Sequence, residues 1–126
     1  LEATRALRSE AVRVQLLAVK RIYVEPLGDD ALSQQVRDRL ISALQSSNRF
    51  IVVGNREDAD AVFKGSVRQE KTGGQISVRL VNAAGDVLWA KSEKSSRGQN
   101  LTSDVARKVV RDLLDLIQRL EHKPKR

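Results

Sequence analysis

The side chains able to act as general acids, bases or nucleophiles are few in this sequence. The one histidine, His122, lies in a polar C-terminal tail, and the chain contains no cysteine. The cluster Glu57, Asp58 and Asp60 could hold a hard cation, but Ala59 interrupts the run of oxygen ligands that calcium loops need. We therefore predict no catalytic, cofactor-binding or metal site and interpret this cluster as a solvated loop.

The basic residues suggest binding rather than reaction chemistry. With 23 basic and 16 acidic residues the net charge is +7, which favours anionic partners such as nucleic acid, lipid headgroups or an acidic protein surface. Proteins that bind single-stranded nucleic acid usually add exposed aromatic side chains, whereas aromatics make up 3% of this chain and Phe50 and Phe63 sit in runs that look buried. A solvated helix face is thus the simpler interpretation of the basic patch candidates, which are Arg37 and Arg39 on one expected helix and Arg107, Lys108, Arg111 and Arg119 on another.

Apolar side chains offer a second kind of candidate surface. Trp89 fits either a core position or an anchor in a protein interface, where tryptophan contributes disproportionately to binding. The expected last helix has an apolar arc of about 220°, about twice what contact with one surface requires. Either the first long helix or residues 1–15 cover the extra side, or a second copy of the chain does. The protein-binding candidates are Trp89, neighbouring Arg79, Val110, Leu114 and Ile117.

The residues around these candidates predict three consecutive antiparallel strands over residues 59–92. The middle strand alternates apolar and polar residues, as strands with one buried face do. Gly73-Gly74 and the segment 82–86 supply turn chemistry, because glycine adopts positive φ without a steric penalty. Gly73-Gly74 precedes a strand rather than a helix, so it is not a phosphate-binding loop.

Two further strands are expected before this meander. Residues 16–27 are rich in β-branched side chains, and the strand should stop at Pro26, which has no N–H group to donate. Residues 50–53 form a short continuous apolar run, the pattern expected where both faces of a strand are covered. A helix between the two implies a right-handed crossover and parallel strands.

Two long helices complete the expected elements. The first spans about residues 30–47, with Asp29 or Asp30 as N-cap and Asn48 as a left-handed residue after its end. The second spans about residues 102–122 and carries the wide apolar arc.

Together these elements predict an α/β two-layer sandwich with the order β-α-β-β-β-β-α. A mixed sheet of about five strands would carry the two long helices on one face. At 126 residues the chain is one domain. Residues 1–15 form an N-terminal extension with a helix over about 2–13, residues 16–122 the single domain, and residues 123–126 a flexible basic tail.

Four segments together resemble a bacterial envelope family. Residues 22–27 are similar to its opening strand ending in Pro plus a large apolar residue, and residues 49–53 to its short second strand. Residues 59–67 carry its Ala-Asp-x-x-x-x-Gly pattern, and residues 78–89 its hairpin ending in Val-Leu-Trp. This pattern, over residues 19–120, resembles the group of CsgG-like curli-secretion lipoproteins, LpoB-like penicillin-binding-protein activators and TolB amino-terminal domains.

The resemblance implies a periplasmic domain, often tethered to the outer membrane by a lipidated cysteine upstream of the folded part. Such domains bind other proteins and catalyse nothing. Curli-type pores insert membrane hairpins with strands of roughly 9–11 residues, and the connections at residues 70–75 and 82–86 leave no room for them. The first residue, Leu1, is not Met, so a cleaved secretory signal, a removed lipid-anchored linker or an ordinary truncation would each explain the start. No apolar run reaches the roughly 18–20 residues that cross a bilayer, so we expect membrane attachment only through an anchor upstream of Leu1.

We therefore expect a non-catalytic, periplasmic and outer-membrane-associated adaptor or assembly protein that binds another cell-envelope protein. The alternative is a cytoplasmic single-stranded nucleic-acid-binding domain, suggested by the net charge of +7 and an α/β design shared with anticodon-binding domains. A homo-oligomer formed through the last helix is compatible with either function.

Overall fold

The computed structural model describes residues 2–70, 73–96 and 105–121. Within this part the chain has the predicted order of strands and helices, preceded by the expected N-terminal helix, which extends farther than residue 13. The helices are α1 (Glu2–Ala18), α2 (Ala31–Ser46) and α3 (Ala106–Glu121), with the short 3-10 helix η1 (Arg56–Asp58); the strands are β1 (Arg21–Val24), β2 (Ile51–Val52), β3 (Ala61–Glu70), β4 (Gly73–Asn82) and β5 (Val87–Ser96).

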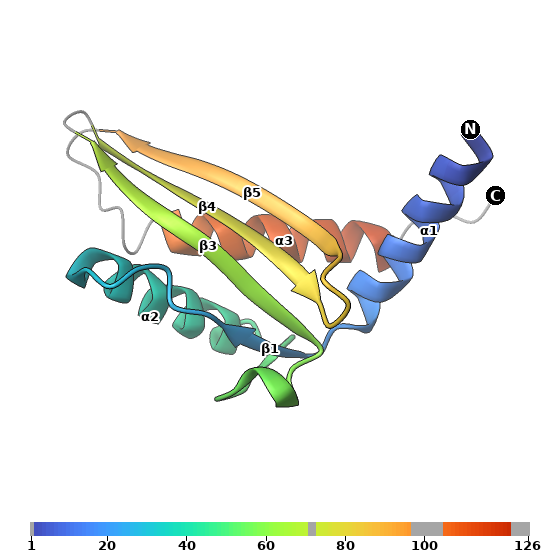
Figure 1. Cartoon of the computed structure of the whole chain (residues 1–126), viewed down its shortest axis with the longest axis horizontal. Helices are drawn as coiled ribbons and strands as arrows, with labels where there is room; N and C mark the ends of the chain where they lie inside the picture. Colours follow the sequence, from blue (N-terminus) through green and yellow to red (C-terminus); the bar gives the residue numbers. More distant parts are fainter. Residues whose placement is uncertain (1, 71–72, 97–104, 122–126) are drawn as a thin grey trace.

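The five strands form one mixed sheet in the order β2-β1-β3-β4-β5. β1 runs parallel to both of its neighbours, as the crossover through α2 predicted, and β3, β4 and β5 form the antiparallel meander. Helices α2 and α3 cover one side of the sheet, and the other side faces the viewer in Figure 1. The predicted two-layer sandwich is confirmed, with α1 against α3 and the β5 edge.

A single core lies between the helices and the sheet. On α2, Val36, Leu40 and Leu44 are spaced four residues apart and all are fully buried, because this spacing places them on one face of the helix. They meet the inward side chains of the strands, among them Ile22 and Phe63, which are also fully buried. The sheet is thereby held rigidly on its helix-covered side.

Local signals end the elements where the sequence predicted. Asp30 caps α2, since its carboxylate accepts from the Ser33 N–H at 3.3 Å. Asn48 adopts a φ of 60°, the left-handed conformation expected after that helix. In the β4–β5 turn, the Asn82 side-chain oxygen accepts from the N–H groups of Ala84 and Asp86, and Gly85 has a φ of 93°.

The first strand is shorter than predicted. Residues 16–18 lie in α1, and β1 begins only at Arg21. Leu16 is buried in the core and Val12, one helical turn earlier, packs beside it. The helical period therefore prevails over the strand-like alternation of the same residues. Pro26 lies just beyond the strand that it was expected to end.

Two further expectations are wrong. Ile51 is 58% exposed, because β2 is the edge of the sheet rather than a strand covered on both faces. Gly73 and Gly74 pair with Glu70 and Gln69 inside the hairpin ladder, so they are strand residues rather than the turn. The residues between these paired positions lie outside the part of the chain that the structure describes.

Much of the wide apolar arc of α3 is covered within the chain. Both α2 and α1 contact this helix. Val110 and Ile117 are consequently buried, each only 2% exposed. Within the described residues, no helix combines the length and the apolar composition needed to cross a membrane.

Candidate binding surfaces

The meander presents one side to the helices and the other to its surroundings. Because successive side chains alternate, Phe63 on β3, Leu80 on β4 and Trp89 on β5 share the helix-covered side. The side chains that alternate with these along each strand point to the opposite side of the sheet, which we call the helix-free face. This face is defined by Lys64, Ser66 and Arg68 on β3, Gln75, Ser77 and Arg79 on β4, and Ala90, Ser92 and Lys94 on β5.

The register arranges these nine residues in three rows across the strands. One row pairs Lys64 with Arg79 and ends at Ala90, and another pairs Arg68 with Gln75 and ends at Lys94. Between them lies a row of three serines, in which the Ser77 and Ser92 hydroxyl oxygens are 3.1 Å apart. Two basic rows thus flank a neutral polar row.

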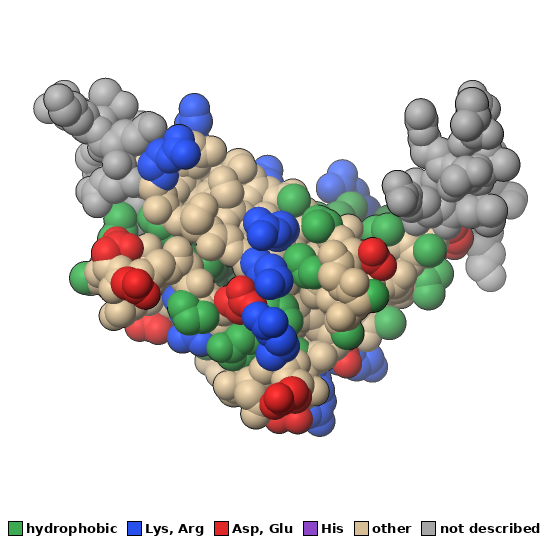
Figure 2. All heavy atoms as spheres, in the orientation of Figure 1, with side chains coloured by type: hydrophobic (Ala, Val, Ile, Leu, Met, Phe, Trp, Pro, Cys, Tyr) green, Lys and Arg blue, Asp and Glu red, His purple; other side chains and the backbone are tan. Residues whose placement is uncertain are grey.

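The helix-free face is strongly basic. Figure 2 shows Lys and Arg side chains gathered in a column near the middle of the molecule, with acidic and hydrophobic side chains beside them. Glu25, beyond the end of β1, is an acidic residue that pairs with this face, accepting from Lys64 at 3.3 Å and also contacting Arg56. No other described carboxylate pairs with the basic residues of the three rows.

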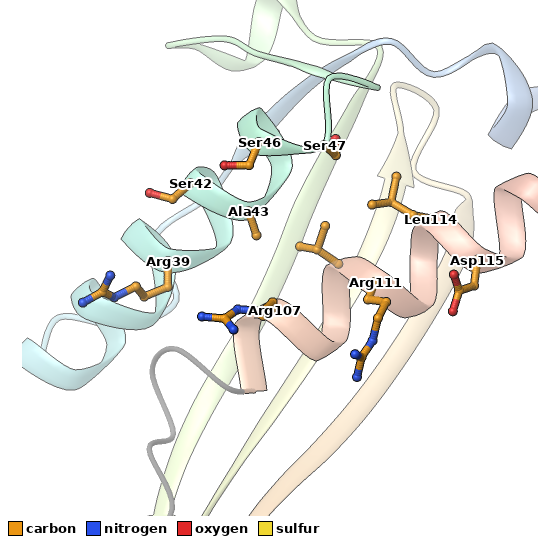
Figure 3. Close-up of a pocket in the computed structure, with 10 residues that line it drawn as sticks. Arg39, Ser42, Ala43, Ser46, Ser47, Arg107, Arg111, Leu114 and Asp115 are labelled. Carbon is orange, nitrogen blue, oxygen red and sulfur yellow. The ribbon is translucent and has the colours of Figure 1, made fainter.

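A groove of about 450 Å³ lies on the other side of the molecule, between α2 and α3. Ala43, Val110 and Leu114 contribute apolar surface, and Ser42, Ser46 and Ser47 line the wall formed by the C-terminal part of α2. Figure 3 shows Arg39, Arg107 and Arg111 around its mouth, with Asp115 farther along α3. An apolar groove edged by guanidinium groups suits a ligand with both an acyl and an anionic part.

The structure divides the protein-binding candidates among different environments. Arg79 is exposed on the helix-free face, whereas Trp89 is half-buried on the other side of the sheet, with its ring centroid 6.1 Å from that of Phe63. Leu114 lines the groove. Val110 also contributes to the groove but is almost fully buried, as is Ile117. These five residues therefore do not form one continuous surface.

The basic patch candidates are likewise distributed. Three of them, Arg39, Arg107 and Arg111, line the groove. Arg37 donates to the Val24 carbonyl at 2.9 Å, which ties α2 to β1. Lys108 lies 3.7 Å from Glu93, and Arg119 borders a shallow depression beside Trp89.

Sequence patterns missed three residues of the helix-free face: Lys64, Arg68 and Lys94. The available signal was the alternation within each strand, which places basic residues two or four positions apart on one side. What joins them is the register between strands, and the misassigned turn at Gly73-Gly74 concealed that register.

Ionisable groups elsewhere in the described chain serve the fold. The Asp60 carboxylate accepts from the backbone N–H groups of Lys20 at 3.0 Å and Arg21 at 2.9 Å. These hydrogen bonds, led by that from Arg21, hold the pKa of Asp60 below its usual value. Asp112 and Glu93 stabilise the ammonium group of Lys91 and raise its pKa. Among the described residues no group of three potential ligands could hold a metal ion, and His122 lies outside them.

Comparison with known proteins places this domain among envelope proteins. A family model described as LptE, lipopolysaccharide-assembly, matches residues 19–119. This match supports the predicted envelope family, although it is not specific to the CsgG-like or LpoB-like groups. No curated protein sequence matches the chain.

Two solved structures share the fold at low sequence identity. The PelC dodecamer from Paraburkholderia phytofirmans is 14% identical, with a TM-score of 0.53 over 79% of this chain and 86% of the PelC chain. TolB from Acinetobacter baumannii is 15% identical, with a TM-score of 0.53 over 82% of this chain and 28% of the TolB chain. Both likenesses concern the fold alone.

Proposed function

Because the chain belongs to the LptE lipopolysaccharide-assembly family, we propose that it is a non-catalytic assembly protein that binds another protein of the lipopolysaccharide-assembly machinery. The observation that carries the proposal is the family match over residues 19–119, which spans the sheet, α2 and nearly all of α3. The family consists of assembly factors rather than enzymes.

The protein is periplasmic, as members of its family are lipoproteins of the outer membrane. Its partner must therefore be reachable from the periplasmic side of that membrane. We propose that this partner is LptD, the envelope protein with which the family is associated.

Two surfaces on opposite sides of a rigid domain support a role in assembly. The helix-free face is basic and polar, whereas the groove between α2 and α3 combines apolar and basic side chains. A domain of this kind has room for two different molecules at once without competition between them.

Co-purification from the native host tests the proposal. The full-length protein, with an affinity tag at its C-terminus, is extracted from outer membranes in mild detergent, and LptD is quantified in the eluate. We expect LptD to be recovered in near-stoichiometric amount. An equally tagged unrelated outer-membrane lipoprotein is the control. Recovery of LptD no greater than with that control would contradict the proposal.

The groove favours a second function, direct contact with lipopolysaccharide itself. Arg39, Arg107 and Arg111 can donate charge-assisted hydrogen bonds to phosphate groups, while Val110 and Leu114 offer apolar contact to an acyl chain. A site that binds a phosphorylated glycolipid needs both phosphate-binding and apolar side chains. They occur together in this groove, whereas the three rows that define the helix-free face contain no large apolar side chain, and the one exposed valine beside them is Val87.

Removing the groove arginines tests this second function. The triple variant Arg39→Gln, Arg107→Gln, Arg111→Gln should bind lipopolysaccharide about tenfold more weakly, because each lost charged contact contributes up to about 1 kcal/mol at a solvent-exposed site. The matched control, Arg68→Gln, Arg79→Gln, Lys94→Gln, removes the same charge from the helix-free face and should bind normally. Equal loss in both triple variants would show non-specific charge attraction instead.

A further inference from the structure

The charge of the helix-free face is not needed for the fold. Lys64 and Arg79 lie directly opposite each other on neighbouring strands, an arrangement in which like charges destabilise a sheet. Glu25 offsets this repulsion at Lys64, 3.3 Å away, whereas Arg79 has no carboxylate within 4.0 Å among the described residues. A sheet surface that only had to be wetted would carry both signs.

The two sides of the same strands differ in how far their charges are balanced. On the helix-covered side of β5, Glu93 alternates with Lys91, and both take part in ion pairs with α3. On the helix-free face the rows from Lys64 to Lys94 contain four basic residues and no acidic one. Within these three rows the positive charge is therefore unbalanced, which suits an external anionic partner.

The chemistry of this face favours carboxylates on a protein over a lipid. The neutral positions of the three rows are Ser66, Ser77 and Ser92 with Gln75 and Ala90, so an acyl chain between the basic rows would meet mainly hydroxyl and amide groups. The apolar row Val62, Val81 and Val87 lies beyond them, and only Val87 in that row is exposed. The backbone N–H groups of the central strand lie in the sheet ladder, which leaves no cradle of N–H groups for a phosphate. The two basic rows are four residues apart along each strand, or about 13 Å. Two basic rows at this separation can each contact a different carboxylate on a broad protein surface.

We propose that the helix-free face of β3, β4 and β5 docks on an acidic surface of a partner protein. The basic rows meet carboxylates of that surface, and the serine row between them donates neutral hydrogen bonds. The inference rests on one part of the proposed function, namely that the chain binds another protein, and it does not depend on which protein that is. Because the groove lies on the other side of the sheet, this docking leaves the groove open for its own ligand.

Site-specific photocrosslinking in the native host tests the inference. A photoreactive benzoylphenylalanine replaces Ser66, an exposed residue in the middle of the face, in the full-length protein. The reference position is Ser42, which lines the groove on α2. The adducts are sequenced to identify the crosslinked segment of the partner.

The expected adduct at Ser66 is a protein segment rich in Asp and Glu. Its yield should fall about tenfold in the background Arg68→Gln, Arg79→Gln, Lys94→Gln, and should stay unchanged in the background Arg39→Gln, Arg107→Gln, Arg111→Gln. Circular dichroism spectra that match the unsubstituted protein establish that both triple variants are folded.

Three outcomes would overturn the inference: an adduct with lipopolysaccharide but no protein, a protein segment without acidic residues, or equal yield in the two triple variants. These outcomes are separate from a failure of the proposed function. If LptD co-purifies while Ser66 gives no protein adduct, docking uses another surface and the proposed function stands. If Ser66 crosslinks to an acidic segment of a protein outside lipopolysaccharide assembly, the docking surface stands and the proposed function falls.

Discussion

At the scale of single residues, Asp60 joins the first strand to the loop before β3. Its carboxylate accepts two backbone hydrogen bonds, from Lys20 and Arg21, which would otherwise be satisfied by water. We expect Asp60→Ala to lower the free energy of unfolding by about 1 kcal/mol at pH 7, the low end for charged hydrogen bonds because the site is solvent-exposed. Urea denaturation measures the difference.

The same interaction gives a pH dependence with a defined sign. The pKa of Asp60 is lowered in the folded protein, so the folded state binds its proton less readily than the unfolded chain. Its contribution is complete above the unfolded pKa of about 3.9 and is lost as the pH falls through the lower folded value. The difference between Asp60→Ala and the unsubstituted protein should thus shrink as the pH falls below about 3.9 and vanish once the pH is below the folded pKa. Glu57→Ala, in the adjacent η1 helix, is the control; a similar loss in that variant would contradict the assignment.

Trp89 could serve either as a core residue or as an anchor in a protein interface, and its contacts favour the core. Its ring meets Phe63 edge-on, at an interplanar angle of 89°, and the side chain packs on the core. We expect Trp89→Ala to lower the free energy of unfolding by about 3 kcal/mol, and Trp89→Phe by much less, because the second variant keeps an aromatic ring at this position. Thermal unfolding compares them. If Trp89→Ala unfolds like the unsubstituted protein but loses its partner, Trp89 is an interface anchor instead.

At the scale of elements, the sequence predicted what depends on local chemistry. Asp30 as a cap, Asn48 as a left-handed residue and the turn from Asn82 to Asp86 are confirmed, since each rests on hydrogen bonds or φ preferences within a few residues. The errors concern what distant residues decide. Residues 16–18 could be helix or strand, and tertiary packing of Leu16 selected the helix.

Gly65 shows an element-level requirement that the Ala-Asp-x-x-x-x-Gly pattern did not explain. A β-carbon on this residue would lie 2.2 Å from the Ser77 carbonyl oxygen on β4. Gly65→Ala must therefore push β3 and β4 apart, and we expect it to lower the free energy of unfolding by about 1–3 kcal/mol, as for other overpacking substitutions.

The matched control for Gly65 is Gly54, around which a β-carbon would meet no atom within 4 Å. Gly54→Ala should change the unfolding midpoint in urea little or raise it slightly. If Gly65→Ala is tolerated as well as Gly54→Ala, the close approach of the two strands at this point does not constrain the sequence.

At the scale of the whole molecule, the binding surfaces depend on topology more than on pattern. The sequence identified Arg79, Arg107, Arg111 and Leu114 as candidates, but it could not assign them to separate surfaces because their positions depend on strand register and on which helix covers α3. Arg79 belongs with Lys64 on the helix-free face, and Leu114 with Arg107 in the groove. The periodicity of apolar residues in the sequence places a residue on one face of its own helix or strand. Only the assembled sheet and its helices show which residues of different elements lie next to each other.

Coverage of α3 also bears on oligomerisation. Val110 and Ile117, which could have met a second copy of the chain, are buried within one molecule. We therefore expect a monomer in sedimentation velocity experiments, with no dependence of the sedimentation coefficient on protein concentration beyond ordinary non-ideality. A concentration-dependent shift towards a dimer, abolished by Leu114→Glu in the exposed groove, would mean that α3 self-associates.

Delivery of lipopolysaccharide to the cell surface tests the central claim most directly. In the native host the gene is depleted, and newly made lipopolysaccharide accessible at the outer face of the outer membrane is quantified by surface labelling. An assembly protein of this family should be required, so the accessible fraction should fall sharply and recover with the full-length protein. Undiminished surface lipopolysaccharide after complete depletion would contradict the account.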